Sequence, residues 1–252
     1  MGNRTINTDI RDACNEDQAI TQYFKTRSPE NWSFEQMTFT DCVFEGLEFY
    51  NCKFSNAKFE NCQFKQIIFN QCDLSKASFN NCNIEENDLN NLVFRDVKLN
   101  GCEFVECHFP SLIAKNSSFI GVSINKSSLK NSAFYECTFA RSKAKGAYFN
   151  GLKATKSKMQ NMMLNANNLS GLQFEECDFT STDLSECSFV NTRFSDCQLN
   201  DVSFRHSTLH GLTLERIQIF EVDFDKCASI TGLKISKDLS EQMLATCGIS
   251  IV

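Results

Sequence analysis

Residues 59–82, FENCQFKQIIFNQCDLSKASFNNC, repeat one pattern every five residues. Phe59, Phe64, Phe69, Leu74 and Phe79 stand five positions apart, and each has a small or apolar residue two positions before it. A period of five fits neither an α-helix, at about 3.6 residues per turn, nor a strand, at about 2. Short fixed periods are typical of solenoids, in which each repeat buries its apolar face against the next.

The same period continues from Phe34 to Phe224 without a change of spacing. Within each five, we expect the central residue and the residue two positions before it to point inward. The last residue is often Asn or Gly, and these two residues accept the backbone angles that a corner needs. Each repeat therefore predicts one short side and one bend. Stacked sides would enclose a continuous column of Phe and Cys.

This stretch and residues 174–197, FEECDFTSTDLSECSFVNTRFSDC, resemble the pentapeptide-repeat family. The resemblance implies an all-β solenoid, namely a right-handed quadrilateral parallel β-helix in which four repeats make each coil. In this sequence no loop interrupts the repeat register. We assign residues 32–228 to this β-helix, as nearly ten coils. Residues 1–31 are expected to form an N-terminal cap, with a helix that starts at Thr8 or Asp9. Residues 229–252 are expected to add a helix and a short strand.

Twelve of the fourteen cysteines occupy the inward position, where Ala, Ser, Val and Leu also occur. This exchange favours small buried thiols over the two alternatives, disulfides and metal ligands. A coil of about twenty residues predicts that Cys42, Cys62, Cys82 and Cys102 stack in one column. Cys14 and Cys247 lie outside the repeat pattern, and their role is open.

The surface charge changes along the chain, whose net charge is −6. A central belt is basic and spreads over all four predicted sides: Lys115, Lys126, Lys130, Arg141, Lys143, Lys145, Lys153, Lys156 and Lys158. One predicted side, centred on Phe44, Phe64, Ile84 and Phe104, is acidic. Its candidate partner-binding residues are Glu45, Glu85, Glu86, Glu103, Glu106, Asp183 and Glu186. The next predicted side, centred on Phe49, Phe69, Leu89 and Phe109, is rich in side-chain amides, which can form hydrogen-bonded ladders along the stack. These amide residues are Asn51, Asn70, Gln71, Asn90, Asn91, Asn131, Asn150, Asn168 and Asn191.

After Cys227 the sequence predicts a helix capped by Ser236, a stop at Gly248 and a strand from Ile249 to Val252. This ending resembles that of the gyrase-protecting members of the family, which are the Qnr group, MfpA, and the microcin and albicidin immunity proteins. The resemblance implies a homodimer joined through the C-terminus. Its candidate interface residues are Leu239, Met243, Leu244, Ile249 and Ile251. The alternative is a simple C-terminal cap, which needs the same apolar residues.

The sequence favours a non-enzymatic protein without a cofactor or metal. Phosphate-binding loops are absent, and His206 and His210 fall on different sides of a five-residue repeat. Neither a signal peptide nor a long apolar run is present, so we expect a cytoplasmic bacterial protein. The resemblance implies a DNA mimic that binds DNA gyrase or another topoisomerase and protects it from inhibitors. One alternative is a protein-interaction scaffold or secreted effector module. Another is nucleic-acid binding through the lysine belt, which lacks the interleaved aromatic residues of single-strand binders.

Overall fold

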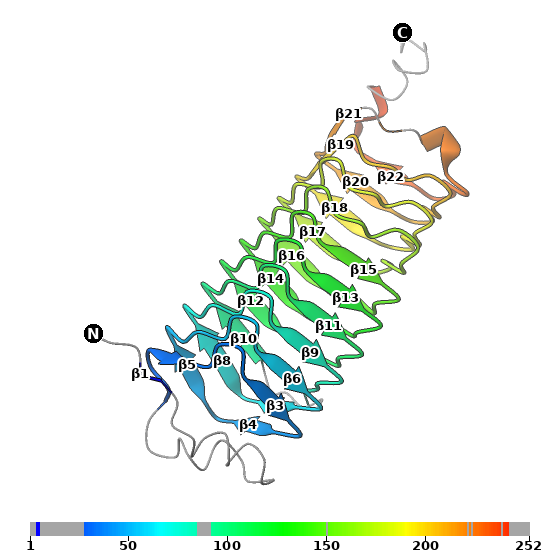
Figure 1. The fold of residues 1–252 in the computed structure, drawn as a ribbon. Helices are drawn as coiled ribbons and strands as arrows, with labels where there is room; N and C mark the ends of the chain where they lie inside the picture. The colour runs from blue at the N-terminus through cyan, green and yellow to red at the C-terminus, as the bar shows by residue number, and fades with distance from the viewer. Residues whose placement is uncertain are drawn as a thin grey trace.

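The computed structural model describes residues 4–5, 28–84, 92–149, 151–220, 222, 224–237 and 239–241. It is a parallel β-solenoid that forms a rod, in which strands follow one another from blue at one end to orange at the other (Figure 1). Each described strand of the rod pairs in parallel with a strand of a neighbouring coil, since each coil repeats the path of the previous one. The predicted fold class is therefore confirmed.

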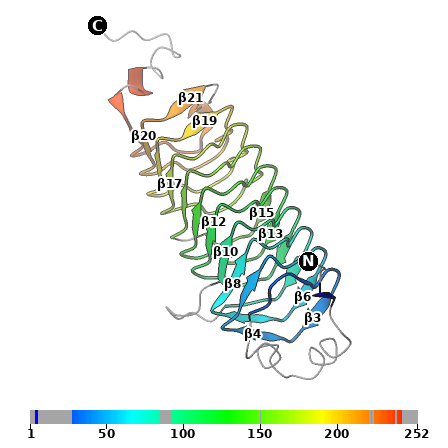
Figure 2. The same ribbon diagram turned by 90° about the vertical axis from the view of Figure 1, so that its left-hand side faces the viewer.

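The rod has four faces, which we number in chain order. Face 1 begins with Phe34, face 2 with Phe39, face 3 with Phe44 and face 4 with Phe49. Each face continues through the inward residues that stack on its first ring in the following coils. Seen from the side, the strands of the two longer sheets form rows along the rod (Figure 2).

Face 4 carries the longest sheet, with ten strands and therefore nine turns of the solenoid between its first and last strand. At a strand spacing of about 4.8 Å, this sheet is about 43 Å long. In order along the rod, its strands are β5 (Glu48–Tyr50), β8 (Ile67–Asn70), β10 (Leu92–Arg95), β12 (Ile113–Lys115), β14 (Ala133–Tyr135), β16 (Lys153–Thr155), β17 (Gln173–Glu175), β18 (Arg193–Ser195), β20 (Thr213–Glu215) and β22 (Lys234–Ile235).

Face 2 carries a sheet of six strands, and faces 3 and 1 have shorter pairings extended by isolated bridges. The face 2 strands are β3 (Thr38–Thr40), β6 (Lys58–Glu60), β9 (Ser78–Asn80), β11 (Glu103–Val105), β13 (Ser123–Asn125) and β15 (Lys143–Lys145). Face 3 has β4 (Val43–Glu45) and β7 (Gln63–Lys65), and face 1 has β2 (Trp32–Ser33), β19 (Gln198–Asn200) and β21 (Gln218–Phe220).

The corners use the left-handed backbone region, as the Asn and Gly positions predict. Asn51, for example, has a φ of 48° and Gly151 has a φ of 72°. At Gly151 an added Cβ would also meet Asn131 Oδ1 of the previous coil, so the Asn131 side chain would have to move. Larger residues hold the same conformation at other corners, including Lys76, Glu106 and Arg141.

One coil is longer than the others, which corrects the prediction that four repeats make every coil. Phe49 pairs with Phe69, twenty residues later, whereas Phe69 pairs with Phe94 and Phe79 with Phe104, twenty-five residues later. The additional five residues lie between Ile84 and Leu92. The predicted column that ends at Cys102 is also wrong, since Asn83 pairs with His108 and Cys107 therefore follows Cys82.

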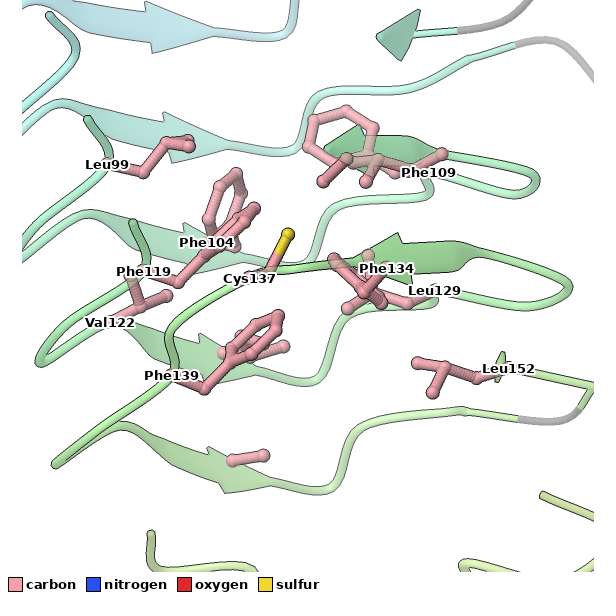
Figure 3. Packing of buried hydrophobic residues seen from close by; sticks show 14 of the residues in the cluster. Leu99, Phe104, Phe109, Phe119, Val122, Leu129, Phe134, Cys137, Phe139 and Leu152 are labelled. Carbon is pink, nitrogen blue, oxygen red and sulfur yellow. The ribbon is translucent and has the colours of Figure 1, made fainter. Parts of the chain in front are cut away.

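Aromatic rings fill the interior of the first coils. On face 2, Phe39, Phe59, Phe79 and Phe104 form one stack, with successive ring centroids 5.0, 4.7 and 5.0 Å apart. Each buried Phe contributes on the order of 1.5–3 kcal/mol to folding. Further along, Phe104, Phe119, Phe134 and Phe139 still point into the interior (Figure 3). The core then thins, as predicted, around an apolar cavity of about 30 Å³ that is lined in part by Ala144, Leu152 and Met159.

The two ends of the stack are partly described. Strand β1 (Arg4–Thr5) pairs in parallel with β2, beside Trp32, while the predicted N-terminal helix lies outside the described residues.

At the C-terminal end of the rod, a short 3₁₀-helix, η1 (Phe224–Lys226), precedes β22, which pairs with β20. Parallel strand pairing therefore extends past residue 228, at which the sequence predicts that the β-helix ends. A helix begins after Ser236, whose carbonyl accepts a hydrogen bond from Ser240 N at 3.0 Å.

Candidate partner-binding surface

The predicted acidic residues project from two faces and not from one. Glu45 ends strand β4 on face 3, whereas Glu103 begins strand β11 on face 2. Asp183 also lies on face 2, where it bridges to Met163 and Ser203. The longer coil causes this correction, because it shifts every residue after Ile84 by one face. Glu85 and Glu86 lie outside the described residues.

Glu106 and Glu186 occupy the corner between faces 2 and 3, with φ angles of 53° and 57°. This left-handed conformation turns the chain from one face to the next. Both side chains are exposed. The described candidate carboxylates therefore lie on two adjacent faces and at the corner between them, with Glu103 and Asp183 on face 2 and Glu45 on face 3.

Basic residues interrupt this acidic edge. Lys126 Nζ lies 3.2 Å from Glu106 Oε1 in the next coil. On face 2, the outward position holds Glu103, Ser123, Lys143, Met163 and Asp183 in successive coils. Glu45 stands beside Lys65 in the register of β4 and β7. The edge is thus a series of separated carboxylates.

The amide-rich side is also divided by the longer coil. Asn51, Asn70 and Gln71 belong to face 4 and the corner after it, whereas Asn131, Asn168 and Asn191 belong to face 3 and its corner. Asn90 and Asn91 lie outside the described residues, as does Asn150.

Amide ladders form at the corners. Asn51 Nδ2 donates to Asn31 Oδ1 at 2.6 Å, and Asn81 Nδ2 donates to Asn61 Oδ1 at 2.9 Å. These bonds link side chains of neighbouring coils, which gives the amides a structural role.

The basic belt surrounds the rod, as predicted. Lys158 lies on face 1, Lys143 and Lys145 on face 2, Lys130 on face 3, and Lys115 and Lys153 on face 4. Because the belt covers every face, it separates the acidic residues near Glu103 from those near Asp183.

The cysteines of the repeats are structural. All twelve are free thiols, and all but the half-buried Cys227 are buried, which confirms the predicted thiol positions. Most of these thiols donate to carbonyls of the previous coil, as Cys62 Sγ does to Phe39 O at 3.3 Å. Ser142 donates in the same way to Phe119 O, which explains why Ser replaces Cys at this position.

Burial raises the pKa of Cys102 to about 12 and the pKa of Cys137 and Cys187 to about 11. These thiols are therefore weak nucleophiles at neutral pH.

The described residues contain no group of three or more His, Cys, Asp or Glu side chains placed to hold a metal ion. His206 lies at the corner after Phe204, and His210 lies on face 3, so the two do not form a helical ligand pair. Among the described helical segments, none is both long and apolar enough to cross a membrane.

Comparison with known families agrees with this geometry. The family described as "Pentapeptide repeat region" matches residues 30–89 and 155–224, which is more than half of the chain. The chain belongs to the pentapeptide-repeat family. A second description, "Pentapeptide repeats (8 copies)", matches residues 72–109. No curated protein sequence matches the chain.

Several solved pentapeptide-repeat structures are similar to this rod. A trypsin-treated variant of QnrB1, a plasmid-mediated fluoroquinolone resistance protein, is 16% identical, with a TM-score of 0.55 over 86% of this chain and 98% of that chain. HetL, a protein involved in heterocyst differentiation regulation in the cyanobacterium Nostoc, is 14% identical, with a TM-score of 0.41 over 85% of this chain and 92% of that chain. The similarity to QnrB1 shows a shared fold.

Proposed function

We propose that this pentapeptide-repeat protein is a non-enzymatic DNA mimic that binds DNA gyrase or a related topoisomerase and protects it from inhibitors. The observation that carries the proposal is the overlap with QnrB1 along 98% of that chain, with a TM-score of 0.55. A cytoplasmic location in a bacterium is part of the same proposal, since the enzyme acts on the chromosome.

Charge supplies the physical reason for binding. The protein has a net charge of −6, and its described candidate carboxylates lie on faces 2 and 3 and at the corner between them. A rod with this charge is attracted over long range to the basic groove in which a topoisomerase holds DNA. Within this proposal, Glu45, Glu103, Glu106, Asp183 and Glu186 contact the enzyme, together with Glu85 and Glu86.

Dimerisation through the C-terminal end belongs to the proposal as well. Phe220 and Ile230, in the last coil, are 66% and 52% exposed, so this end presents apolar surface that a second copy could cover. Leu239 is buried in the core of its own chain and therefore caps the last coil. Met243, Leu244, Ile249 and Ile251 lie outside the described residues and are proposed to complete the interface. Truncation before Lys237 should convert dimers to monomers in light scattering, and an unchanged mass would refute this role.

The proposal is tested by supercoiling with purified gyrase in the presence of a quinolone. We expect the protein to restore supercoiling or, at higher concentration, to inhibit it. Glu103→Lys combined with Glu186→Lys should weaken either effect, whereas Glu175→Lys, on face 4, should not. Gyrase activity that is indifferent to about 10 μM protein, a typical upper range for a specific complex, would contradict the proposal.

A scaffold function is the second candidate, and one observation favours it. Face 4 has an apolar and basic groove that the proposed acidic contact does not use.

A further inference from the structure

Four apolar side chains form a stripe on the outer surface of face 4. Ile68, Val93, Ile113 and Ala133 are paired in register on β8, β10, β12 and β14, which lie side by side in Figure 1. All four are half-buried and point away from the core, because they alternate with buried residues of the same strands. The same position holds Glu48 before the stripe and Lys153 after it. The solenoid therefore does not require apolar residues at this position.

An open groove of about 650 Å³ runs beside the stripe, which we call the face 4 groove. Val93 and Ile113 form its apolar wall, and Arg95, Lys115, Tyr135 and Lys156 supply its other principal side chains. Tyr135 is 43% exposed, which leaves its ring available for contact. The groove thus combines aliphatic, aromatic and cationic groups.

The groove is positively charged in an acidic protein. Arg95 and Lys115 are exposed, as is the adjacent Lys153, and none of the three forms an ion pair with any residue in the described ranges. Glu136 is the single carboxylate among the groove residues. Such a surface favours a partner that carries carboxylates.

The backbone of face 4 determines how a partner can bind. Strands β8, β10, β12 and β14 already pair with neighbours on both sides, so a partner cannot add a strand to them. A partner must bind through side chains, and its own backbone must be satisfied internally. A helix meets this condition. Its pitch of about 5.4 Å is close to the strand spacing of about 4.8 Å, so apolar residues on successive turns meet successive residues of the stripe.

We propose that the face 4 groove binds an acidic amphipathic helix of a protein partner. Apolar residues of the helix cover Val93 and Ile113, and its flanking carboxylates pair with Arg95, Lys115 and Lys153. Nucleic acid fits less well, because phosphates would pair with the cations but leave the aliphatic stripe exposed to water. The proposal does not depend on gyrase binding, which uses a different face and the opposite charge.

The test is fluorescence anisotropy with the full-length protein and a labelled helical peptide of Leu, Glu and Ala. Its leucines are spaced at i, i+3, i+4 and i+7 to form one apolar face. We expect saturable binding in the micromolar range. Lys115→Glu and Ile113→Ser should each weaken it by about tenfold, which corresponds to about 1.4 kcal/mol. Lys145→Glu, which changes an outward belt lysine on face 2, is the matched control and should leave affinity unchanged.

Three kinds of result would overturn the proposal. The first is no saturation at about 100 μM peptide, which exceeds the expected dissociation constant at least tenfold. The second is binding that depends on charge alone. It would show as an equal loss of affinity in Lys115→Glu and Lys145→Glu, or as equal binding of a peptide that has the same composition but scattered leucines. The third is tighter binding of a single-stranded oligonucleotide that Ile113→Ser does not weaken, which would assign the groove to nucleic acid. Circular dichroism of each variant confirms that the fold is retained.

Discussion

The ring of Phe79 stacks on the ring of Phe104, with their centroids 5.0 Å apart and their planes at 15° to each other. These residues are twenty-five positions apart, although Phe59 stacks on Phe79 across only twenty. The coil between Phe79 and Phe104 therefore contains one additional repeat length, inserted after Ile84. This insertion shifts every later residue by one face relative to a solenoid with four repeats in each coil.

Removal of residues 86–90 should leave the solenoid intact. The deletion joins Glu85 to Asn91 and places Phe94 five positions after Ile84, which gives a regular coil of four repeats. Shortening a connection by five residues changes the free energy of unfolding by less than about 1 kcal/mol. The melting temperature should therefore shift by no more than about 4 °C. A loss of more than about 10 °C would show that these residues take part in the stack.

The aromatic column should dominate stability. Phe79→Ala removes a fully buried ring and should lower the free energy of unfolding by about 3–5 kcal/mol in chemical denaturation. Tyr148→Ala is the matched control, because its ring is 69% exposed, and it should change stability by no more than about 0.5 kcal/mol. Similar losses in both variants would argue against a column in which Phe79 is central.

The cavity in the middle of the rod should accept additional methyl groups. Ala144 lines it, so Ala144→Val should raise the free energy of unfolding by about 0.5–2 kcal/mol. Ala114 is also a buried central residue but does not line the cavity, so Ala114→Val should lower stability by about 1–3 kcal/mol. Equal destabilisation by both substitutions would mean that the core around Ala144 is as tightly packed as the rest.

The buried thiols should resist modification and should couple stability to alkaline pH. In the variant with Cys14, Cys227 and Cys247 replaced by Ser, a disulfide reagent should label no thiol at pH 8 until denaturant is added. Unfolded thiols ionise near pH 9.0, whereas burial raises the pKa of folded Cys102 to about 12. Unfolding therefore releases protons above pH 9, so stability should fall as pH rises from about 9 to 12. Rapid native labelling, or constant stability in this window, would contradict burial of these groups.

The sequence predicts the shape of the rod but not the faces on which its residues lie. The five-residue period follows from Phe and Cys at fixed spacing, so the inward column and the thiol positions could be derived from the sequence. The four-sided shape is implied by the resemblance to the pentapeptide-repeat family. The longer coil could not, because its insertion equals one repeat and Leu89 preserves the spacing. Only the pairing between coils, such as that of Phe69 with Phe94, reveals it. Without this shift, Ile68 and Val93 fall on different faces, and the apolar stripe cannot be recognised.

The most direct test of the proposed function is competition between this protein and linear duplex DNA for immobilised gyrase. We predict that the protein binds gyrase and that its apparent dissociation constant rises linearly with the DNA concentration. Binding that DNA leaves unchanged, or no binding at about 10 μM protein, would contradict mimicry of DNA.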